Sequence, residues 1–271
     1  MLIDTHAHLS MLARRGIDPH DCLRSLFAEG FAGIIDISLN PGDLPRRITE
    51  FSNSPRVFFA AGLWPHADSI TNREKLAGEL ERDIIAVKTG EQGQKFCALG
   101  EFGMDHNWNG KGKDGSADLE GERELMEIQM EIAQRLDLPV IIHSRDAAEE
   151  TAVTLARYPR VRGVVHCFSY GPAEVKTFLD LGYYISFAGN ITYKSAGNVQ
   201  EACKLVPAER LFLETDCPYL APVPHRGKPA HPGMVEEVYK HVSEIRKTNL
   251  MTLAKQISEN VKMLLRVDDG F

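Results

Sequence analysis

Short apolar runs alternate with amphipathic segments along the chain, and this alternation predicts its secondary structure. Each apolar run is rich in β-branched, aromatic or other large apolar residues and is followed by polar residues, which is typical of a buried strand. We predict eight strands, over residues 2–8, 33–38, 57–62, 96–101, 139–143, 162–166, 183–187 and 210–216.

The segments between the strands carry apolar residues at helical spacing. The clearest is 119–137, in which Leu125, Ile128, Ile132 and Leu136 would share one face of a helix. We predict helices over residues 18–29, 44–52, 69–89, 119–137, 146–158, 172–181, 194–205, 234–247 and 251–266. Two longer connections, 105–118 and 218–232, are rich in glycine, proline or charged residues and predict loops.

Strands that alternate with helices predict a parallel sheet of the α/β class. Eight such units close into a (β/α)8 barrel, or TIM barrel, which takes about 250 residues as one unit. With 271 residues, the chain is long enough for a single domain over 1–271. The alternative architecture is an open, doubly wound sheet. In a barrel, the active site lies at the mouth formed by the carboxyl ends of the strands.

Composition restricts the class of protein. The chain is 43% hydrophobic and 25% charged, which is ordinary for a globular protein. It has no apolar run of membrane-spanning length and no signal-like N-terminus, so we expect a cytoplasmic protein that does not bind membranes. The net charge of -7 argues against a protein that coats DNA non-specifically, but not against an enzyme that holds phosphate locally.

The cysteines favour a reducing compartment over a disulfide framework. There are five, an odd number, and none forms a C-x-x-C pair. Cys167 and Cys217 directly follow His166 and Asp216. Strand alternation would turn both thiols away from the face that these neighbours occupy. We therefore expect buried filler at these two positions rather than metal ligands.

The first predicted strand carries a pattern suited to metal binding. His6 and His8 alternate along it, so both would point to the same face, whereas on a helix they would diverge by about 200°. The pair alone is a weak signal, because two such histidines are more often ordinary surface or core groups. Its value depends on what else lies nearby.

Five of the eight predicted strands end in side chains that could bind a metal. These are His6, His8, Glu101, His143, His166 and Asp216. In a barrel they would converge on one mouth. Any one of these histidines could be an ordinary core or mouth residue whose hydrogen bonds are made within the protein. Because metal-binding residue types recur at equivalent strand ends, we favour metal binding. The set exceeds what one tetrahedral ion needs, so we predict two divalent ions bridged by Glu101.

Asp216 has two possible roles. It could be a metal ligand, or it could act as the base that takes a proton from an attacking water molecule; Glu101 and Asp216 are our catalytic candidates. Helix capping or a salt bridge is the alternative for Asp216. Glu214 would lie on the same strand face as Asp216, and Thr215 would point away. The ligand types suit zinc, manganese or magnesium, so the ions stay unidentified.

Five motifs together resemble one family. They are Asp4-Thr5-His6-Ala7-His8-Leu9, Gly100-Glu101-Phe102-Gly103-Met104-Asp105, Pro139-Val140-Ile141-Ile142-His143-Ser144-Arg145-Asp146-Ala147, His166-Cys167-Phe168-Ser169, and Glu214-Thr215-Asp216-Cys217-Pro218-Tyr219-Leu220. In this order, the set resembles the TatD family of metal-dependent deoxyribonucleases, within the amidohydrolase-like barrels. The resemblance implies metal-dependent hydrolysis of phosphodiesters, typically in DNA, with the six residues named above around the metals.

The resemblance also indicates groups that would bind the substrate phosphate. Arg145, His66 and Arg226 lie in matching segments, and Asn190 at the end of strand 183–187 is a further candidate. Arginine binds phosphate oxygens in a fork, although both arginines could instead form surface ion pairs. Trp108, in the loop 105–118, could stack on a base or pack on its own loop.

Two positions depart from the family pattern. The family usually has histidine where Trp64 stands, and Asn-Glu where this chain has Ala230-His231. The expected metal ligands are unaffected. The departures bear on substrate contacts and on a third metal site near that loop.

Three functions are consistent with these observations. The first is a two-metal nuclease that takes DNA, as single strands or ends, and needs no obligate protein partner. The second is an amidohydrolase or lactonase that acts on a small carbonyl compound, because one fold supports many chemistries. The third is a metal-stabilised interaction protein that hydrolyses nothing.

Overall fold

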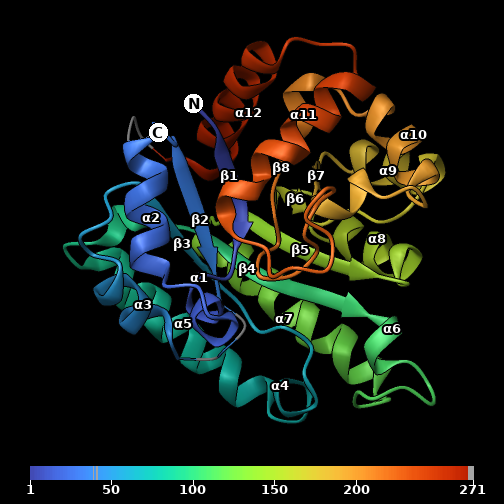
Figure 1. Ribbon diagram of the computed structural model, residues 1–271. Coiled ribbons are helices and arrows are strands. Elements are labelled where there is room, and N and C mark those ends of the chain that lie inside the picture. The colour runs from blue at the N-terminus through green and yellow to red at the C-terminus, as the bar shows by residue number, and fades with distance from the viewer. Residues whose placement is uncertain (39, 41, 268–271) are drawn as a thin grey trace.

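The apolar runs of the chain form one parallel sheet that wraps into a barrel (Figure 1). The computed structural model describes residues 1–38, 40 and 42–267, so the last four residues of the expected domain lie outside the described residues. Within these ranges the strands are β1 (Ile3–Ala7), β2 (Gly33–Ile37), β3 (Val57–Ala61), β4 (Phe96–Asp105), β5 (Val140–Arg145), β6 (Gly163–Val165), β7 (Tyr184–Phe187) and β8 (Leu211–Leu213). Each strand pairs with the next along the chain.

The barrel closes between its last and first strands through the segment that follows β8. The Asp216 N–H donates to the His6 carbonyl oxygen at 3.0 Å, and the His8 N–H donates to that of Cys217 at 2.9 Å. The Thr5 hydroxyl adds a bond to the Leu213 carbonyl oxygen at 3.0 Å. The eight strands therefore form a nearly closed TIM barrel, as predicted, and the open-sheet alternative is wrong.

Helices cover the outside of the barrel (Figure 1). The α-helices are α1 (Leu9–Leu12), α2 (Pro19–Ala28), α3 (Leu44–Glu50), α4 (Ala67–Thr71), α5 (Arg73–Thr89), α6 (His106–Asn109), α7 (Leu119–Leu136), α8 (Ala148–Ala156), α9 (Pro172–Asp180), α10 (Gly197–Leu205), α11 (Val235–Ile245) and α12 (Leu250–Leu265). Short 3-10 helices are η1 (Ala13–Arg15), η2 (Gly93–Lys95), η3 (Gly189–Thr192), η4 (Ala208–Arg210) and η5 (Pro232–Met234).

The last helix covers the seam of the barrel. Helix α12 packs against both β1 and β8. Its buried stripe contains Leu253, Ile257, Val261 and Leu264, which recur every three or four residues along the helix. Burying each such side chain stabilises the fold by about 1.5–3 kcal/mol. This stripe therefore holds the two ends of the sheet together.

The predicted helix over 69–89 is two helices. Helix α4 ends at Thr71, and α5 begins at Arg73. Between them, the Asn72 side-chain amide donates to the backbone carbonyl oxygen of Asp68 at 3.2 Å and to its side chain at 2.8 Å. Asparagine disfavours a continuous helix because its side chain competes for such backbone groups.

Two strand boundaries and one loop also differ from the prediction. Strand β4 continues to Asp105, and α6 follows at once, so only part of 105–118 is loop. Strand β8 ends at Leu213, short of the predicted Asp216, whose φ of +59° lies outside the extended region. No described helix combines the length and apolar content needed to cross a bilayer.

Candidate metal centre

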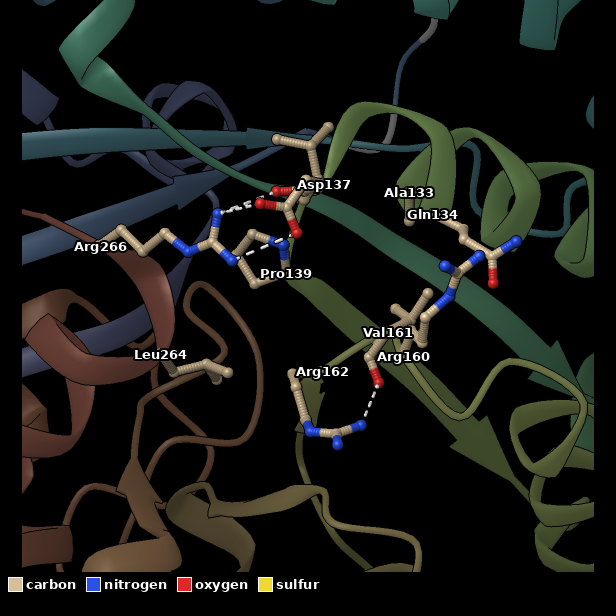
Figure 2. A pocket seen from close by; sticks show the side chains of 10 residues that line it. Ala133, Gln134, Asp137, Pro139, Arg160, Val161, Arg162, Leu264 and Arg266 are labelled. Carbon is tan, nitrogen blue, oxygen red and sulfur yellow. Dashed lines mark hydrogen bonds and ion pairs between the residues drawn. The ribbon is translucent and has the colours of Figure 1, made fainter.

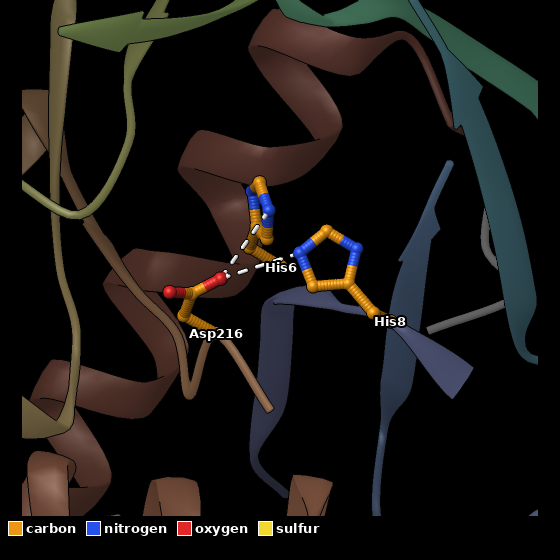
Figure 3. Close-up of side chains that lie close together, drawn as sticks. All are labelled: His6, His8 and Asp216. Carbon is orange, nitrogen blue, oxygen red and sulfur yellow. Dashed lines mark ion pairs between the residues drawn. The ribbon is translucent and has the colours of Figure 1, made fainter. Parts of the chain in front are cut away.

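The first strand directs two histidines toward one carboxylate. His6 lies in β1 and His8 directly follows it, and both side chains are buried. Figure 3 shows their rings turned toward Asp216, which comes from the segment after β8. Asp216 Oδ1 is 3.8 Å from His6 Nε2 and 3.3 Å from His8 Nε2. The first strand and the segment after the last strand thus meet at one point of the mouth.

Glu101 enters the site from a bulge in β4. The pairing of β4 with β5 shifts between Gly100 and Phe102, which leaves Glu101 as the extra residue. A bulge re-aims a side chain relative to regular alternation. Gly103 permits this path, because its φ is +153° and a Cβ there would lie 1.9 Å from the His143 carbonyl oxygen. The re-aimed Glu101 side chain is buried.

The two oxygens of Glu101 face different histidines. Oε2 lies 3.2 Å from His6 Nε2 and 3.8 Å from His8 Nε2. Oε1 lies 2.9 Å from both His143 Nδ1 and His166 Nε2, and these two nitrogens are 3.1 Å apart. The Glu101 carboxylate therefore lies between two groups of histidine nitrogens, one facing each of its oxygens.

Three of the histidines are oriented by an oxygen behind the ring. The contacts are His8 Nδ1 with Ile37 O at 3.0 Å, His143 Nε2 with Asp105 Oδ2 at 3.0 Å, and His166 Nδ1 with Glu214 Oε1 at 3.2 Å. Metal-binding histidines are typically held in this way, with the other ring nitrogen left for the ion. In each of these rings, that other nitrogen faces Glu101.

His6 provides a test of whether the cluster fits a metal. Its ring is fully buried and stacks on the His166 ring, with centroids 4.1 Å apart. Within the described part of the chain, its Nδ1 atom has no hydrogen-bond partner, and its Nε2 atom makes no hydrogen bond of regular geometry although Glu101 Oε2 lies 3.2 Å away. An unpaired buried nitrogen costs free energy unless a ligand supplies the missing interaction. A cation between His6 and the carboxylates would supply it.

The spacing of the ligand atoms also fits divalent ions. Two ligands of one ion lie about 3.0 to 3.4 Å apart when each is about 2.1 Å from the metal, depending on whether the geometry is octahedral or tetrahedral. The contacts to Glu101 described above fall at or near this spacing. Two groups of close atoms suited to an ion are His6 with His8 and Asp216, and His6 with Glu101 and His166. The residues present therefore fit a metal.

The protonation of the ion-free site follows from its crowded charges. Burial raises the pKa of Glu101, but the histidines around it, first His166, outweigh burial and hold the pKa well below its usual range. Burial lowers the pKa of His166, but Glu101 and Glu214 outweigh it and raise the pKa well above the ordinary value. Protons on imidazoles thus balance the carboxylates, and a cation would replace them.

Two of the expected substrate-binding residues lie near His143. Arg145 is the last residue of β5, and its exposed side chain makes no ion pair with any described residue. His66 precedes α4 and is exposed, with its ring centroid 4.4 Å from that of Trp64. Trp64 in turn contacts the His143 ring edge to face, at 5.6 Å.

The other two expected substrate-binding residues lie together elsewhere on the rim. Asn190 is in η3, after β7, and its Oδ1 atom is buried without a partner among the described residues. Arg226 is exposed and stacks over the Tyr193 ring at 4.4 Å. The Tyr193 N–H donates to the Asn190 carbonyl oxygen at 3.0 Å. The described contacts thus connect His66 to His143 through Trp64, and Arg226 to Asn190 through Tyr193.

Sequence reasoning missed the residues that support the site from behind. Asp105 and Glu214 orient histidines, although both lie inside the matched motifs. Asp4 accepts hydrogen bonds from the Thr215 N–H at 2.9 Å and hydroxyl at 2.5 Å, beside Asp216. Burial raises the pKa of Asp4 to about 8, despite these bonds. One sequence feature could have identified these three carboxylates. Each lies within a few residues of a candidate metal ligand in one of the matched motifs.

One of the two cysteine expectations needs correction. Cys217 is fully buried, as expected of filler, but Cys167 is only partly buried. Strand β6 ends at Val165, and Cys167 has a φ of +45°, so regular strand alternation does not reach it. Its N–H donates to Glu214 Oε1 at 2.8 Å.

The two departures from the family pattern have different surroundings. Trp64 lies against His143 and therefore belongs to the mouth. Ala230 is fully buried, and its N–H donates to the Pro218 carbonyl oxygen at 3.1 Å, which ties the loop to the segment after Asp216. Burial, together with the charge of His225, lowers the pKa of the neighbouring His231.

Comparisons with known proteins show which family the chain belongs to. The family model described as TatD related DNase matches residues 3–266. The uncharacterized metal-dependent hydrolase YabD of Bacillus subtilis (strain 168) is 31% identical, over 99% of this chain and 100% of that protein. The uncharacterized metal-dependent hydrolase YcfH of Escherichia coli (strain K12) is 33% identical, over 98% of this chain and 96% of that protein.

A solved structure extends the likeness to three dimensions. The crystal structure of YJJV, a TatD homolog from Escherichia coli K12, matches with a TM-score of 0.85 and 28% identity, covering 98% of both chains. The family model spans nearly the whole barrel, and the relatives are named metal-dependent hydrolases. The resemblance that the motifs carry is thereby confirmed. The chain belongs to the TatD family and is a metal-dependent hydrolase.

Proposed function

We propose that this hydrolase cleaves phosphodiester bonds in DNA with two divalent ions. The observation that carries the proposal is the divided carboxylate of Glu101, one oxygen of which faces His6 while the other faces His143 and His166. A shared carboxylate is a common bridge in two-metal sites, which recur in phosphatases and nucleases. The name of the matching family, TatD related DNase, supports the choice of substrate.

Each side of Glu101 would hold one ion. His6, His8 and Asp216 would complete the first set of ligands, on the Oε2 side. His143 and His166 would complete the second, on the Oε1 side. When bound, such ions lower the pKa of a coordinated water molecule and polarise a phosphoryl oxygen.

Asp216 is the residue best placed to accept a proton. Its Oδ1 atom faces His6 and His8, whereas Oδ2 makes no hydrogen bond within the described ranges. Burial raises the pKa of this carboxyl, but the hydrogen bond to His8 and the charges of the neighbouring histidines outweigh burial and lower it. Asp216 is therefore ionised and can take the proton of a water molecule that attacks phosphorus.

Cationic and polar groups on the rim would hold the substrate. Arg145, which has no ion pair with described residues, would bind phosphate oxygens beside His143, and His66 would contact the same phosphate. Arg226 and Asn190 would meet a more distant part of the strand. Because the carboxylates of Glu101 and Asp216 are deeply set, with side chains 4% and 15% exposed, a flexible single strand or an end suits the site best.

The test is a substrate and metal panel. Metal-stripped protein is loaded separately with Zn, Mn and Mg and given labelled single-stranded DNA, duplex DNA, a lactone and an aryl ester. We expect DNA cleavage, with single strands or ends preferred. Cleavage of the lactone alone by folded, metal-loaded protein would overturn the nuclease assignment and favour a carbonyl substrate; no hydrolysis of any compound would also overturn it.

Two variants test the assigned roles. Asp216→Asn should lower turnover on DNA by about 100- to 10,000-fold, the usual contribution of a positioned acid or base, with the fold intact. Arg145→Ala should weaken phosphodiester cleavage far more than any residual ester cleavage, because only the former needs the phosphate contact. Turnover like that of the unmodified protein in folded Asp216→Asn contradicts its role.

A further inference from the structure

The two tryptophans of the chain form a pair beside the candidate metal centre. Trp64 follows β3, and Trp108 lies in α6, directly after β4. Their ring centroids are 6.3 Å apart at an interplanar angle of 63°. Trp64 also contacts the His143 ring at 5.6 Å. The tryptophan pair is therefore continuous with one of the histidines that face Glu101.

Asp105 connects the tryptophan pair to the same histidine. Its Oδ2 atom contacts His143 Nε2 at 3.0 Å, and its Oδ1 atom accepts a hydrogen bond from the backbone N–H of Trp108 at 2.8 Å. The Gly115 N–H donates to the Trp108 carbonyl oxygen at 2.8 Å, and a Cβ on Gly115 would lie 2.7 Å from the indole. The loop thus closes tightly on Trp108, which fixes its position before any ligand binds.

Trp108 nevertheless remains open to solvent. Its side chain is 40% exposed, although tryptophan is a large apolar residue that usually buries most of its surface. If Trp108 served only to pack the loop, we would expect its indole ring to be buried rather than partly exposed. An aromatic ring that is both fixed and exposed suits stacking with a planar ligand, because little conformational entropy is lost on binding.

A free cation lies on the same side of the mouth. Arg145 ends β5 two residues after His143, and α6 is tied to the next residue, Asp146, by the Asn107 side-chain amide at 3.1 Å. Arg145 is exposed and has no ion pair within the described ranges. An arginine beside a stacking surface matches the phosphate and the base of one nucleotide.

We propose that Trp64 and Trp108 form a stacking site for one nucleobase of a single-stranded DNA substrate, next to the phosphate that Arg145 binds. This inference rests on the proposed nuclease function and adds to it a preference for strands that carry bases. It also assigns a role to Trp64, one of the two positions at which the sequence departs from the family pattern that its motifs resemble. Any base can stack on an aromatic ring, so we expect the site to distinguish DNA that carries bases from abasic DNA. We do not expect it to distinguish one base sequence from another.

The kinetic test compares two substrates of equal length, an oligodeoxythymidylate and an abasic oligodeoxynucleotide. Trp108→Ala should lower kcat/KM on the first by about 5- to 150-fold, mostly through KM, which is the usual loss of one stacked base. Cleavage of the abasic strand should change less than about twofold. Trp108→Phe keeps an aromatic face and should retain most of the activity. Trp64→Ala should also lower kcat/KM more on the base-bearing strand than on the abasic strand, and the ratio of the two rates is compared because Trp64 also contacts His143.

A matched surface variant controls for general effects. Leu205→Ala removes a side chain that is 44% exposed at the end of α10, before the amino end of β8, and should change neither rate. Circular dichroism and metal content confirm that each variant is folded and loaded. An equal loss on both substrates, or a loss on neither, would overturn the stacking site while leaving the nuclease function intact.

Fluorescence separates failure of the stacking site from failure of the proposed function. Because the chain has no tryptophan beyond this pair, its tryptophan emission reports only on Trp64 and Trp108. Metal-loaded protein is titrated with phosphorothioate-linked versions of the two oligonucleotides, which resist cleavage. Quenching by the base-bearing strand alone supports the stacking site even if no DNA is cleaved. Equal quenching, or none, overturns it.

Discussion

The two ends of the barrel both gather charged side chains, but these side chains are satisfied in different ways. At the mouth, buried carboxylates and imidazoles converge on a common centre around Glu101. At the opposite end, before β5 and β6, a cavity of about 200 Å³ is lined partly by Arg160, Arg162, Arg266 and Asp137 (Figure 2).

The charged groups at the opposite end have ordinary partners. Arg266 Nη1 lies 2.6 Å from Asp137 Oδ2, and Arg162 donates to the Val161 carbonyl oxygen at 3.2 Å (Figure 2). Arg162 also donates to the Pro159 carbonyl oxygen at 2.5 Å. The arginines are also exposed, so water completes their hydrogen bonds. Nothing in this cavity requires a ligand.

The mouth differs because its polar atoms are buried. The fully buried His6 Nδ1 atom has no hydrogen-bond partner among the described residues and no access to water, and leaving a buried polar group unpaired costs about 1–3 kcal/mol. Buried polar groups that converge on one point therefore indicate a functional site. A cavity lined by exposed charged side chains is weaker evidence of function. Fold-level reasoning agrees, since barrel enzymes use the carboxyl ends of their strands.

Removing the shared carboxylate should produce the largest effect. Glu101→Gln keeps the shape of the side chain but removes the charge between the two sets of histidines. We expect hydrolysis to fall by about 1,000-fold or more, since ions contribute several kcal/mol to such reactions and each 1.36 kcal/mol is tenfold. Steady-state kinetics and metal content by mass spectrometry measure the effect.

The matched control is Glu120→Gln, the same exchange on the exposed surface of α7, which should leave activity unchanged. If the Glu101→Gln variant keeps its metal content and its activity within tenfold of the unmodified protein, the buried carboxylate at the mouth is not required for function. That result would contradict the proposed difference between the two ends of the barrel.

Weakening an orienting contact should have an intermediate effect. Glu214 accepts from His166 and from the Cys167 N–H, and it also contacts the Ser186 hydroxyl. Glu214→Gln should lower metal affinity by about 10- to 100-fold, the usual loss when such a partner is changed. Competition with a chelating dye measures the affinity. An unchanged affinity would show that His166 needs no carboxylate behind it.

Metal binding at the mouth should release protons. In the ion-free protein, protonated His166 contributes stability that is present below its ordinary pKa and is lost as pH rises through its raised pKa. A cation must displace that proton, so metal affinity should increase as pH rises through this range. Calorimetric titration at pH 7 in buffers of different ionisation enthalpy should show release of about one proton or more per chain. Equal heats in all buffers would contradict this.

The sequence was sufficient to predict the barrel because its signals are local. Each strand is a short apolar run, and each strand end carries its polar side chain within a few residues. Boundaries were less accurate where one residue changes the backbone, as Asn72 does between α4 and α5 and as Asp216 does after β8. Such effects depend on a single hydrogen bond or dihedral angle.

The six candidate ligands were predicted from the sequence, but their arrangement was not. The six candidate ligands of the mouth followed from strand ends, yet the division of Glu101 between two sets depends on a bulge that pairing with β5 creates. The roles of Asp105 and Glu214 depend on which ring nitrogen each contacts, which no local pattern encodes. Ligation and substrate binding by the individual residues stay predictions.

The smallest effect is expected at the opposite end of the barrel, from Arg266→Ala. The Arg266 side chain is 62% exposed and that of Asp137 82%, so loss of their ion pair should lower the free energy of unfolding by only about 0.2–1 kcal/mol. Hydrolysis should stay within about twofold of the unmodified protein. Urea unfolding and the DNA assay measure the two quantities. A tenfold loss of hydrolysis with normal stability and metal content would mean that the arginine-lined cavity contributes to activity. Burial of charged groups would then no longer distinguish the functional end of the barrel from the opposite end.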